Sequence, residues 1–497
     1  MVSRDWNVFR KGDPIRVLYV GAESSNLYQL VKAEGTVNTL HYPFPAIKPP
    51  LPWKPASGSD VATHLTHAGV DDVGNLPPRK IQDALIETFF THIYPGFPIL
   101  DAQLFLHQYH SNDDDPPLLL LQSVLVAAAR ISHLPTVANS RPAVAAALFR
   151  RAKALFDMRH ENDRVHLVQA AMLLTWHSED ADTVAKNVWH WTAQAVRIAF
   201  GLGMHRDLSA TSRTLMPDAD KREYRRCWWI SCQVEALFAL KFGRPSMIRR
   251  EDYDQPALTS DDFQDLNGKA DERVNVKYCI LNSELAEVAL EIGASLAPRS
   301  ARNGIVGIDE HLANIGSRLP STHDFWSCQL RLNYSMINLT TLRTREGYDN
   351  LLLAQDAASS ILTTFECMSS QGTIRMCQPL CAPTLFAATL QFVKTIKHAV
   401  TTGNRLSALS AHAQMERLLG PIEELAVYCP NVGALQKLCI TLTSKCSRMI
   451  REQRPADTIS TADESQQAYT ALEDLMASFD MPYEDLDFDA ADWTNAF

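Results

Sequence analysis

The 497-residue sequence lacks any apolar run long enough to cross a bilayer. Its longest apolar stretch, residues 118–129, is interrupted by Gln122 and Ser123, whereas a membrane-spanning helix needs about 20 apolar residues. Residues 1–14 contain no apolar segment of a secretory signal. The ten cysteines are too sparse for a disulfide-based fold. These absences predict an intracellular protein that does not associate with membranes.

The sequence also lacks the motifs of common catalytic and metal sites. No Cys-x-x-Cys pair occurs, and the nearest approximation, Cys377 with Cys381, has no His or Cys cluster beside it to complete a zinc site. Histidine pairs at 64–67 and 107–110 lack the glutamate of a metalloprotease motif. Neither a Gly-x-Ser-x-Gly turn nor a phosphate-binding glycine loop is present. We therefore predict that the chain has no catalytic, metal-binding or cofactor-binding residue and is not an enzyme.

Basic side chains are absent from residues 455–497, and this segment accounts for the whole net charge of −10. The segment contains no Lys, Arg or His but eleven acids: Asp457, Asp463, Glu464, Glu473, Asp474, Asp480, Glu484, Asp485, Asp487, Asp489 and Asp492. Residues 1–454 therefore carry a net charge of only +1. The chain is a neutral body joined to a strongly acidic tail, and the two parts need separate interpretations.

The body has ordinary globular composition, with 46% hydrophobic and 21% charged residues, so it can bury a large core. Residues 15–20 and 36–44 have the pattern of two short strands. Six prolines between residues 43 and 55 predict an extended linker, because proline fixes φ and lacks a backbone donor. We interpret residues 1–78 as an N-terminal extension with a short β element and a Pro-rich linker.

From residue 79 the apolar pattern becomes helical. Ile81, Leu85, Phe89 and Ile93 recur every four residues and define one helix face. The pattern predicts further helices at about 100–110, 117–133, 140–160, 163–178, 183–203, 219–242, 273–297, 323–346, 350–370, 383–401, 407–428 and 432–452. Four residues stand where N-caps are preferred: Asp101, Ser140, Asp163 and Asp218. Residues 79–452 thus read as one large all-α domain of packed helical hairpins, without a fixed repeat.

Two stretches within residues 186–256 carry an ordered set of short motifs. A predicted helix ends in Leu-Gly-Met-His-Arg at 202–206, and the next begins with Arg-Arg-x-Trp-Trp at 225–229. Gly-Arg-Pro at 243–245 and Asp-x-Asp-x-Pro at 252–256 follow. Physically, the glycines and the proline end helices, and the tryptophans provide large packing surfaces.

In this order and spacing, the motifs resemble the middle homology region of the fungal zinc-cluster transcription factors, and look closest to the cutinase-type regulators. The resemblance is strong over residues 80–265 and includes the segment Phe89 to Asp101. It implies an all-α regulatory domain without catalytic residues. The residues that carry it, called the signature residues below, are expected to be mainly structural: Gly203, His205, Arg206, Arg226, Trp228, Trp229, Gly243, Arg244 and Pro245. We expect Arg206 and Arg244 to pair with acids such as Asp252 or Asp254.

The sequence departs from that family at one point. The family's DNA-binding module is a cluster of six cysteines holding two zinc ions near the N-terminus, whereas the first cysteine here is Cys227. Zinc binding and base recognition therefore cannot be assigned to any residue of this chain. Two explanations stay open: an upstream exon lies outside this sequence, or the protein acts without its own cluster, through a DNA-binding partner. The basic cluster at 221–226 is interpreted as a helix face rather than a DNA-binding surface.

The acidic tail alternates carboxylates with apolar side chains, a composition typical of disordered activation segments. Repulsion between carboxylates keeps the apolar groups available to a partner. Residues 453–497 are therefore predicted to be a disordered activation tail. Within it, residues 455–497 are predicted to contact transcriptional coactivators through Leu472, Leu475, Met476, Phe479, Tyr483, Leu486, Phe488, Trp493 and Phe497. Alternatives are a solubilising tail and a last helix packed on the body.

Together these features predict a nuclear regulator of transcription, an activator of RNA polymerase II genes acting as a monomer, homodimer or heterodimer. The alternatives are a co-regulator without a zinc cluster, and a cytosolic helical protein that binds a small molecule.

Overall fold

The computed structural model describes residues 15–19, 41–45, 73–111, 115–177, 187–209, 216–264, 268–296, 307–345, 347–429 and 432–452. The predictions for the acidic tail, and for most of the Pro-rich linker, lie outside these residues. No helix in these ranges is long and apolar enough to span a membrane.

The two predicted strands are confirmed. β1 (Ile15–Tyr19) pairs antiparallel with β2 (His41–Pro45). Ile15 lies opposite Pro45, and Val17 lies opposite Pro43. β2 thus begins later than predicted and includes two of the prolines assigned to the linker. Proline is tolerated in so small a sheet because each strand has an open edge, where its missing donor is not needed.

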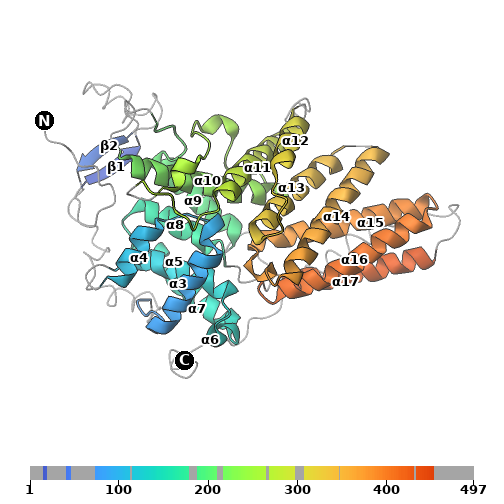
Figure 1. The fold of residues 1–497 in the computed structure, drawn as a ribbon, viewed down its shortest axis with the longest axis horizontal. Coiled ribbons are helices and arrows are strands. Elements are labelled where there is room, and N and C mark those ends of the chain that lie inside the picture. The colour runs from blue at the N-terminus through green and yellow to red at the C-terminus, as the bar shows by residue number, and fades with distance from the viewer. Residues whose placement is uncertain are drawn as a thin grey trace. The chain divides into compact units, whose positions relative to one another are not determined.

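The rest of the described chain is all-α, as predicted, and forms two compact units (Figure 1). Unit one contains α3 (Arg79–His92), α4 (Ala102–His110), α5 (Leu118–Ile131), α6 (Pro135–Ala138), α7 (Arg141–Asp157), α8 (Arg164–Leu174), α9 (Val188–Leu202), α10 (Asp218–Phe242), α11 (Val276–Ser295) and α12 (Ile308–Arg318), with 3-10 helices η1 (Tyr94–Gly96), η2 (Arg250–Asp252) and η3 (Ser260–Phe263). Unit two contains α13 (Phe325–Arg343), α14 (Tyr348–Ser370), η5 (Ile374–Met376), η6 (Pro379–Cys381), α15 (Ala382–Thr401), α16 (Arg405–Ala426) and α17 (Val432–Arg451).

Unit one is built around two helices that bury nearly their whole surface. Every residue of α5 from Leu119 to Ile131 is buried, and α3, α7 and α8 pack against it. α10 is buried from Arg226 to Leu240 and packs against α9 and α11. Four tryptophans lie in this core with almost no exposed surface: Trp176, Trp191, Trp228 and Trp229. Burying such side chains provides most of the favourable free energy of folding.

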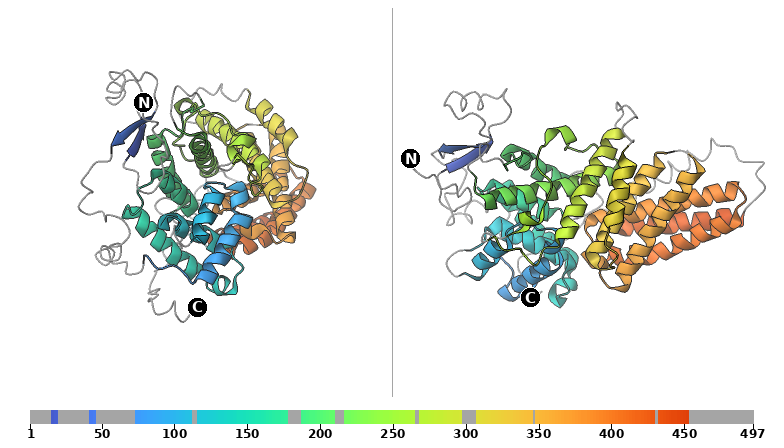
Figure 2. Two further views of the ribbon diagram at one scale, coloured as in Figure 1. Left: turned by 60° about the vertical axis from the view of Figure 1, so that its left-hand side comes forward. Right: turned by 45° about the horizontal axis from the view of Figure 1, so that its top comes forward.

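Unit two is a set of long antiparallel hairpins. α13 packs on α14, and the right-hand view of Figure 2 shows α15, α16 and α17 side by side. α16 and α17 run antiparallel: a short connection joins the end of α16 to the start of α17, and the ring nitrogen of His412, early in α16, contacts the Thr443 carbonyl, late in α17, at 3.2 Å. Phe365 and Phe392 lie fully buried in a shared apolar core. Cys377 and Cys381 are both buried in that core and contact the Gln329 side chain, at 3.3 and 3.4 Å.

Three of the four predicted N-cap residues stand at the N-cap position of their helix, Ser140 among them. Asp101 accepts a hydrogen bond from the Leu104 amide at 2.9 Å, and Asp163 accepts one from the Val165 amide at 2.8 Å. Ser140 precedes α7 without a side-chain cap bond. The prediction for Asp218 is wrong, because Pro217 is the N-cap and Asp218 is the first helical residue. There its carboxylate pairs with Lys221 at 3.0 Å and lies near the positive helix end.

Candidate functional site

The signature residues lie where α9 and α10 end and in the loops that join them to the rest of unit one. Gly203 ends α9 with φ of 72°, and Gly243 ends α10 with φ of 62°. In each case the next residue's amide reaches back into the last helical turn, Met204 to Ala199 O at 3.0 Å and Arg244 to Ala239 O at 2.9 Å. This left-handed ending favours glycine, and Pro245 prevents α10 from continuing.

Arg206 holds the loop that follows η2. Its guanidinium donates to both oxygens of Asp254, at 2.8 and 3.1 Å. The Asp207 amide donates to the same carboxylate at 2.8 Å. The expected ion pair is thus confirmed for Asp254. A two-point contact of this kind fixes orientation as well as distance.

Backbone bonds reinforce the same junction. The carbonyl of His205 accepts hydrogen bonds from the amides of Asp254 and Gln255, both at 3.1 Å. The Gln255 side chain donates to the Met204 carbonyl at 2.7 Å. The turn after α9 and the loop at 253–256 are therefore one connected structure, so a shift in one must move the other.

Two adjacent arginines at the start of the buried part of α10 hold η3. Arg225 pairs with the buried Asp262 carboxylate at 2.7 Å, and Arg226 donates to the Asp262 carbonyl at 2.7 Å. The other carboxylate oxygen of Asp262 accepts from the amide and hydroxyl of Thr259. Asp262, which sequence reasoning did not single out, is thus the centre of this network. Its position beside the signature loop was the available signal.

The tryptophan pair connects this polar network to the core. Trp229 donates its ring N–H to the Pro256 carbonyl at 2.7 Å. The ring of Trp228 packs against His205, with 5.9 Å between ring centres, and Tyr253 packs against both tryptophans. The signature residues thus anchor the loop at 253–256 to the core of unit one.

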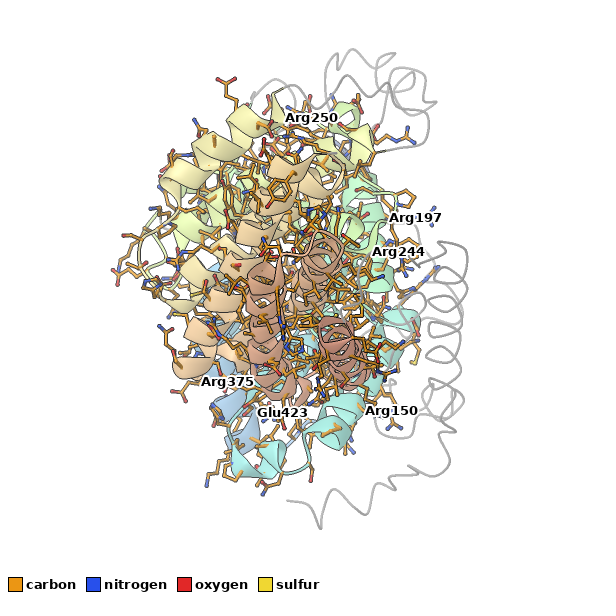
Figure 3. All side chains as sticks on the ribbon, turned by 90° about the vertical axis from the view of Figure 1, so that its right-hand side faces the viewer. Arg150, Arg197, Arg244, Arg250, Arg375 and Glu423 are labelled. Carbon is orange, nitrogen blue, oxygen red and sulfur yellow. The ribbon has the colours of Figure 1, made fainter. Side chains whose placement is uncertain are left out.

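Arg244 lies at the edge of unit one, on the side that also carries Arg197 of α9 (Figure 3). Its guanidinium stacks 4.4 Å from the centre of the Trp189 ring, which is nearly parallel to Phe238. Such cation–π contacts stabilise a charge without a carboxylate. The pairing of Arg244 with Asp252 or Asp254 stays a prediction.

A buried carboxylate supports the loop that follows Pro245. Glu235 of α10 is fully buried, and its carboxylate accepts the Met247 amide at 2.8 Å and the Ser246 hydroxyl at 3.4 Å. Burial raises the pKa of Glu235, although these two hydrogen bonds act in the opposite direction. Glu235 therefore holds the backbone of the loop that carries the exposed Met247 side chain. Phe242, at the end of α10, is exposed as well.

A second group of ionisable side chains lies between α8 and α10. His166 is 3.5 Å from Glu161 and 4.0 Å from Asp163. Burial acts to lower the pKa of His166, but these two acids outweigh burial and raise it to about 9. Across the interface, burial and the like charge of Glu223 raise the pKa of Asp220 to about 7. Near neutral pH, His166 is therefore protonated and Asp220 is protonated in part.

A cavity of about 350 Å³ opens beside η3 in unit one. Its walls come from η1, the start of α4, the loop before α11, and Arg226. Sequence reasoning named Arg226 as structural and missed the cavity, because its walls come from segments that are distant in the sequence and that no motif brings together. Elsewhere, no cluster of three His, Cys, Asp or Glu within the described ranges could hold a metal ion.

Comparison with known proteins gives a consistent result. Residues 86–290 match the fungal specific transcription factor domain. The chain is 31% identical over 452 residues to the acetamidase regulatory protein of Aspergillus fumigatus, covering 85% of this chain and 55% of that protein. It is 30% identical over 449 residues to cutinase transcription factor 1 alpha of Fusarium vanettenii, covering 81% of this chain and 48% of that protein. The chain thus spans about half the length of the curated relatives it matches.

Proposed function

Because the chain belongs to the fungal-specific transcription factor family, we propose that it regulates transcription, with residues 79–452 as the regulatory region and the acidic tail as an activator. The observation that carries this proposal is the extent of the similarity. It covers 85% of the chain in proteins whose names describe regulators, and it extends well beyond residues 86–290. The signature network of unit one fits a structural, non-catalytic role.

We also propose that the described regulatory region does not itself contact DNA. No cysteine precedes Cys227, so a six-cysteine cluster cannot form from residues 1–226. The curated relatives are about twice as long as the matched region. We propose that DNA is reached through a zinc-binding module encoded outside this sequence, or through a DNA-binding partner, and that the protein acts in the nucleus as a monomer or a dimer. No metal or cofactor is assigned to the chain itself.

The acidic tail supports the activator part of the proposal by its chemistry. Eleven acids keep residues 455–497 hydrated, while the five aromatic rings between residues 479 and 497 supply apolar contact area to a coactivator groove. Leu472, Leu475, Met476 and Phe479 have the spacing of one helix face, which such grooves recognise.

A reporter assay tests this part directly. Residues 455–497 are fused to a foreign DNA-binding domain, and reporter output is expected well above that of the domain alone. A matched variant replaces Phe479, Phe488 and Trp493 by alanine and keeps every acid; its output is expected to fall to background, because the apolar contacts are lost. Output at background for the unmodified tail would overturn the activator role.

The route to DNA is tested by the genomic sequence upstream of the codon for Met1. An in-frame exon that encodes two short-spaced cysteine triplets would support the zinc module and eliminate the co-regulator alternative. If no such exon exists, chromatin association of the 497-residue chain that depends on a second DNA-binding protein would support the partner route.

A further inference from the structure

The cavity beside η3 combines one buried cation with an apolar wall. Tyr94, Phe263 and Val274 contribute apolar surface, and Arg226 contributes its guanidinium. A volume of about 350 Å³ is at the small end of the range for metabolite-sized ligands. Its residues come from segments that are distant in the sequence, so a ligand there would contact η1, α4, α10 and the loop before α11 at once.

Arg226 is the one lining cation that the fold buries. Its residue surface is only 7% exposed, and its hydrogen bond goes to the neutral carbonyl of Asp262. Within the described ranges it forms no ion pair shorter than 4.0 Å. A buried guanidinium that lacks a paired carboxylate is costly, and an incoming anion would offset that cost.

The acids of the lining are already engaged. Asp101 caps α4 through the Leu104 amide. Asp271 accepts the Tyr94 hydroxyl at 2.9 Å and the Arg273 amide at 3.1 Å. Glu272 is largely exposed and lies 3.9 Å from Lys269.

One acid of α10, Glu223, interacts with the Arg226 charge without an ion pair between the two side chains within the described ranges. Glu223 is one turn before Arg226, and burial raises its pKa, although Arg226 itself acts in the opposite direction. Lys269 and Arg273 stand at the exposed side of the cavity, where Lys269 lies 3.9 Å from Glu272 and Arg273 lies 3.4 Å from Asp271.

We propose that this cavity binds a small organic carboxylate, whose carboxylate meets Arg226 and whose apolar part lies against Phe263 and Val274. The site is independent of any contact with DNA or coactivators. Because the ligand would bridge α10 and the loop before α11, its binding would also tighten the signature network through Asp262.

Binding is tested on the purified full chain with two probes, benzoate and hexanoate, and with benzamide as the uncharged match to benzoate. Calorimetry and thermal unfolding are expected to show saturable binding of a carboxylate probe at concentrations up to about 10 mM, a range suited to weak, small ligands. Benzamide is expected to bind at least about tenfold more weakly, because it lacks the charge. Failure of both carboxylates to saturate, or equal binding of benzamide, would overturn the proposal.

Variants separate the site from general stability. Arg226→Gln removes the proposed anchor and is expected to weaken binding at least about tenfold. Since Arg226 also holds Asp262, a second variant, Gln103→Trp, blocks the cavity from an exposed position of α4. Lys269→Glu is expected to weaken binding, whereas Lys277→Glu, the same charge change at an exposed position outside the lining, is not. Unchanged affinity in folded Arg226→Gln and Gln103→Trp would contradict the site.

Discussion

Arg206 and Asp254, separated by 48 residues in the chain, form a two-point ion pair that joins the end of α9 to the loop after η2. The pair is partly exposed, so its worth comes from geometry more than from charge. It holds a loop that is also fixed by backbone hydrogen bonds, by the Gln255 side chain and by Trp229. The contribution of the ion pair can be tested by changing its geometry at constant charge.

Arg206→Lys keeps the charge but loses the fork that contacts both oxygens of Asp254. We expect a loss of about 0.5–1 kcal/mol in the free energy of unfolding, measured by urea titration. Asp254→Asn should cost about 1 kcal/mol, because the Asp207 amide also loses its charged acceptor. A double variant that loses the full sum of both changes would show that the two side chains do not interact.

Trp229→Phe removes one hydrogen bond to the Pro256 carbonyl and keeps an aromatic ring in the core. We expect a loss of about 1–2 kcal/mol in the free energy of unfolding and faster amide exchange at residues 253–255. Trp228→Phe is the matched control, because no hydrogen-bond partner of its ring N–H lies in the described part of the chain. Equal exchange in the two variants would mean that the Trp229 bond does not hold this loop.

The interface between α8 and α10 should make stability depend on pH. The pKa of Asp220 is raised to about 7 in the folded protein. Its contribution to the free energy of unfolding is therefore fully present below its ordinary pKa and is lost as pH rises through about 7. The raised pKa of His166 acts in the same direction, and its contribution is lost as pH rises through about 9. Chemical unfolding is therefore expected to show lower stability at pH 8 than at pH 6.

Asp220→Asn should flatten that decrease between pH 6 and pH 8 and raise stability at pH 8, because the amide carries no charge to bury. Asp218→Asn provides the control on the same helix: Asp218 is exposed, and its hydrogen bond with Lys221 lowers its pKa. A pH profile that is unchanged by Asp220→Asn would rule out this carboxylate as the source.

Gly243→Ala should destabilise unit one by about 1 kcal/mol, because its φ of 62° disfavours a side chain. Among the described residues, no atom beyond the two chain neighbours lies within 4 Å of the added Cβ, so the loss would report backbone strain. Gly201→Ala lies inside α9, also with open space around the Cβ, and should stabilise by up to about 1 kcal/mol. The thermal midpoints of the two variants should move in opposite directions; a parallel shift would contradict the strain argument.

Sequence periodicity was sufficient to predict the all-α character and most helices, because helices such as α3 carry a regular apolar face. α12 was not predicted, since its segment follows two glycines and contains a third at Gly316. The spacing of Ile308, Leu312 and Ile315 was nevertheless a usable signal. The division into two compact units was not expected, because it depends on which helices pack together. The Asp262 network and the cavity could not be predicted, since both depend on loops that only tertiary contacts bring together.

Nine of the ten cysteines are buried, so their reactivity toward a thiol reagent reports unfolding of the protein. A thiol reagent should modify only the half-buried Cys367 in the native state, and each further label would mark a local or global unfolding event. Cys227, Cys232 and Cys279 belong to unit one, and the remaining seven belong to unit two. The order in which the cysteines are labelled would therefore show which of the two units unfolds first, without any engineered probe.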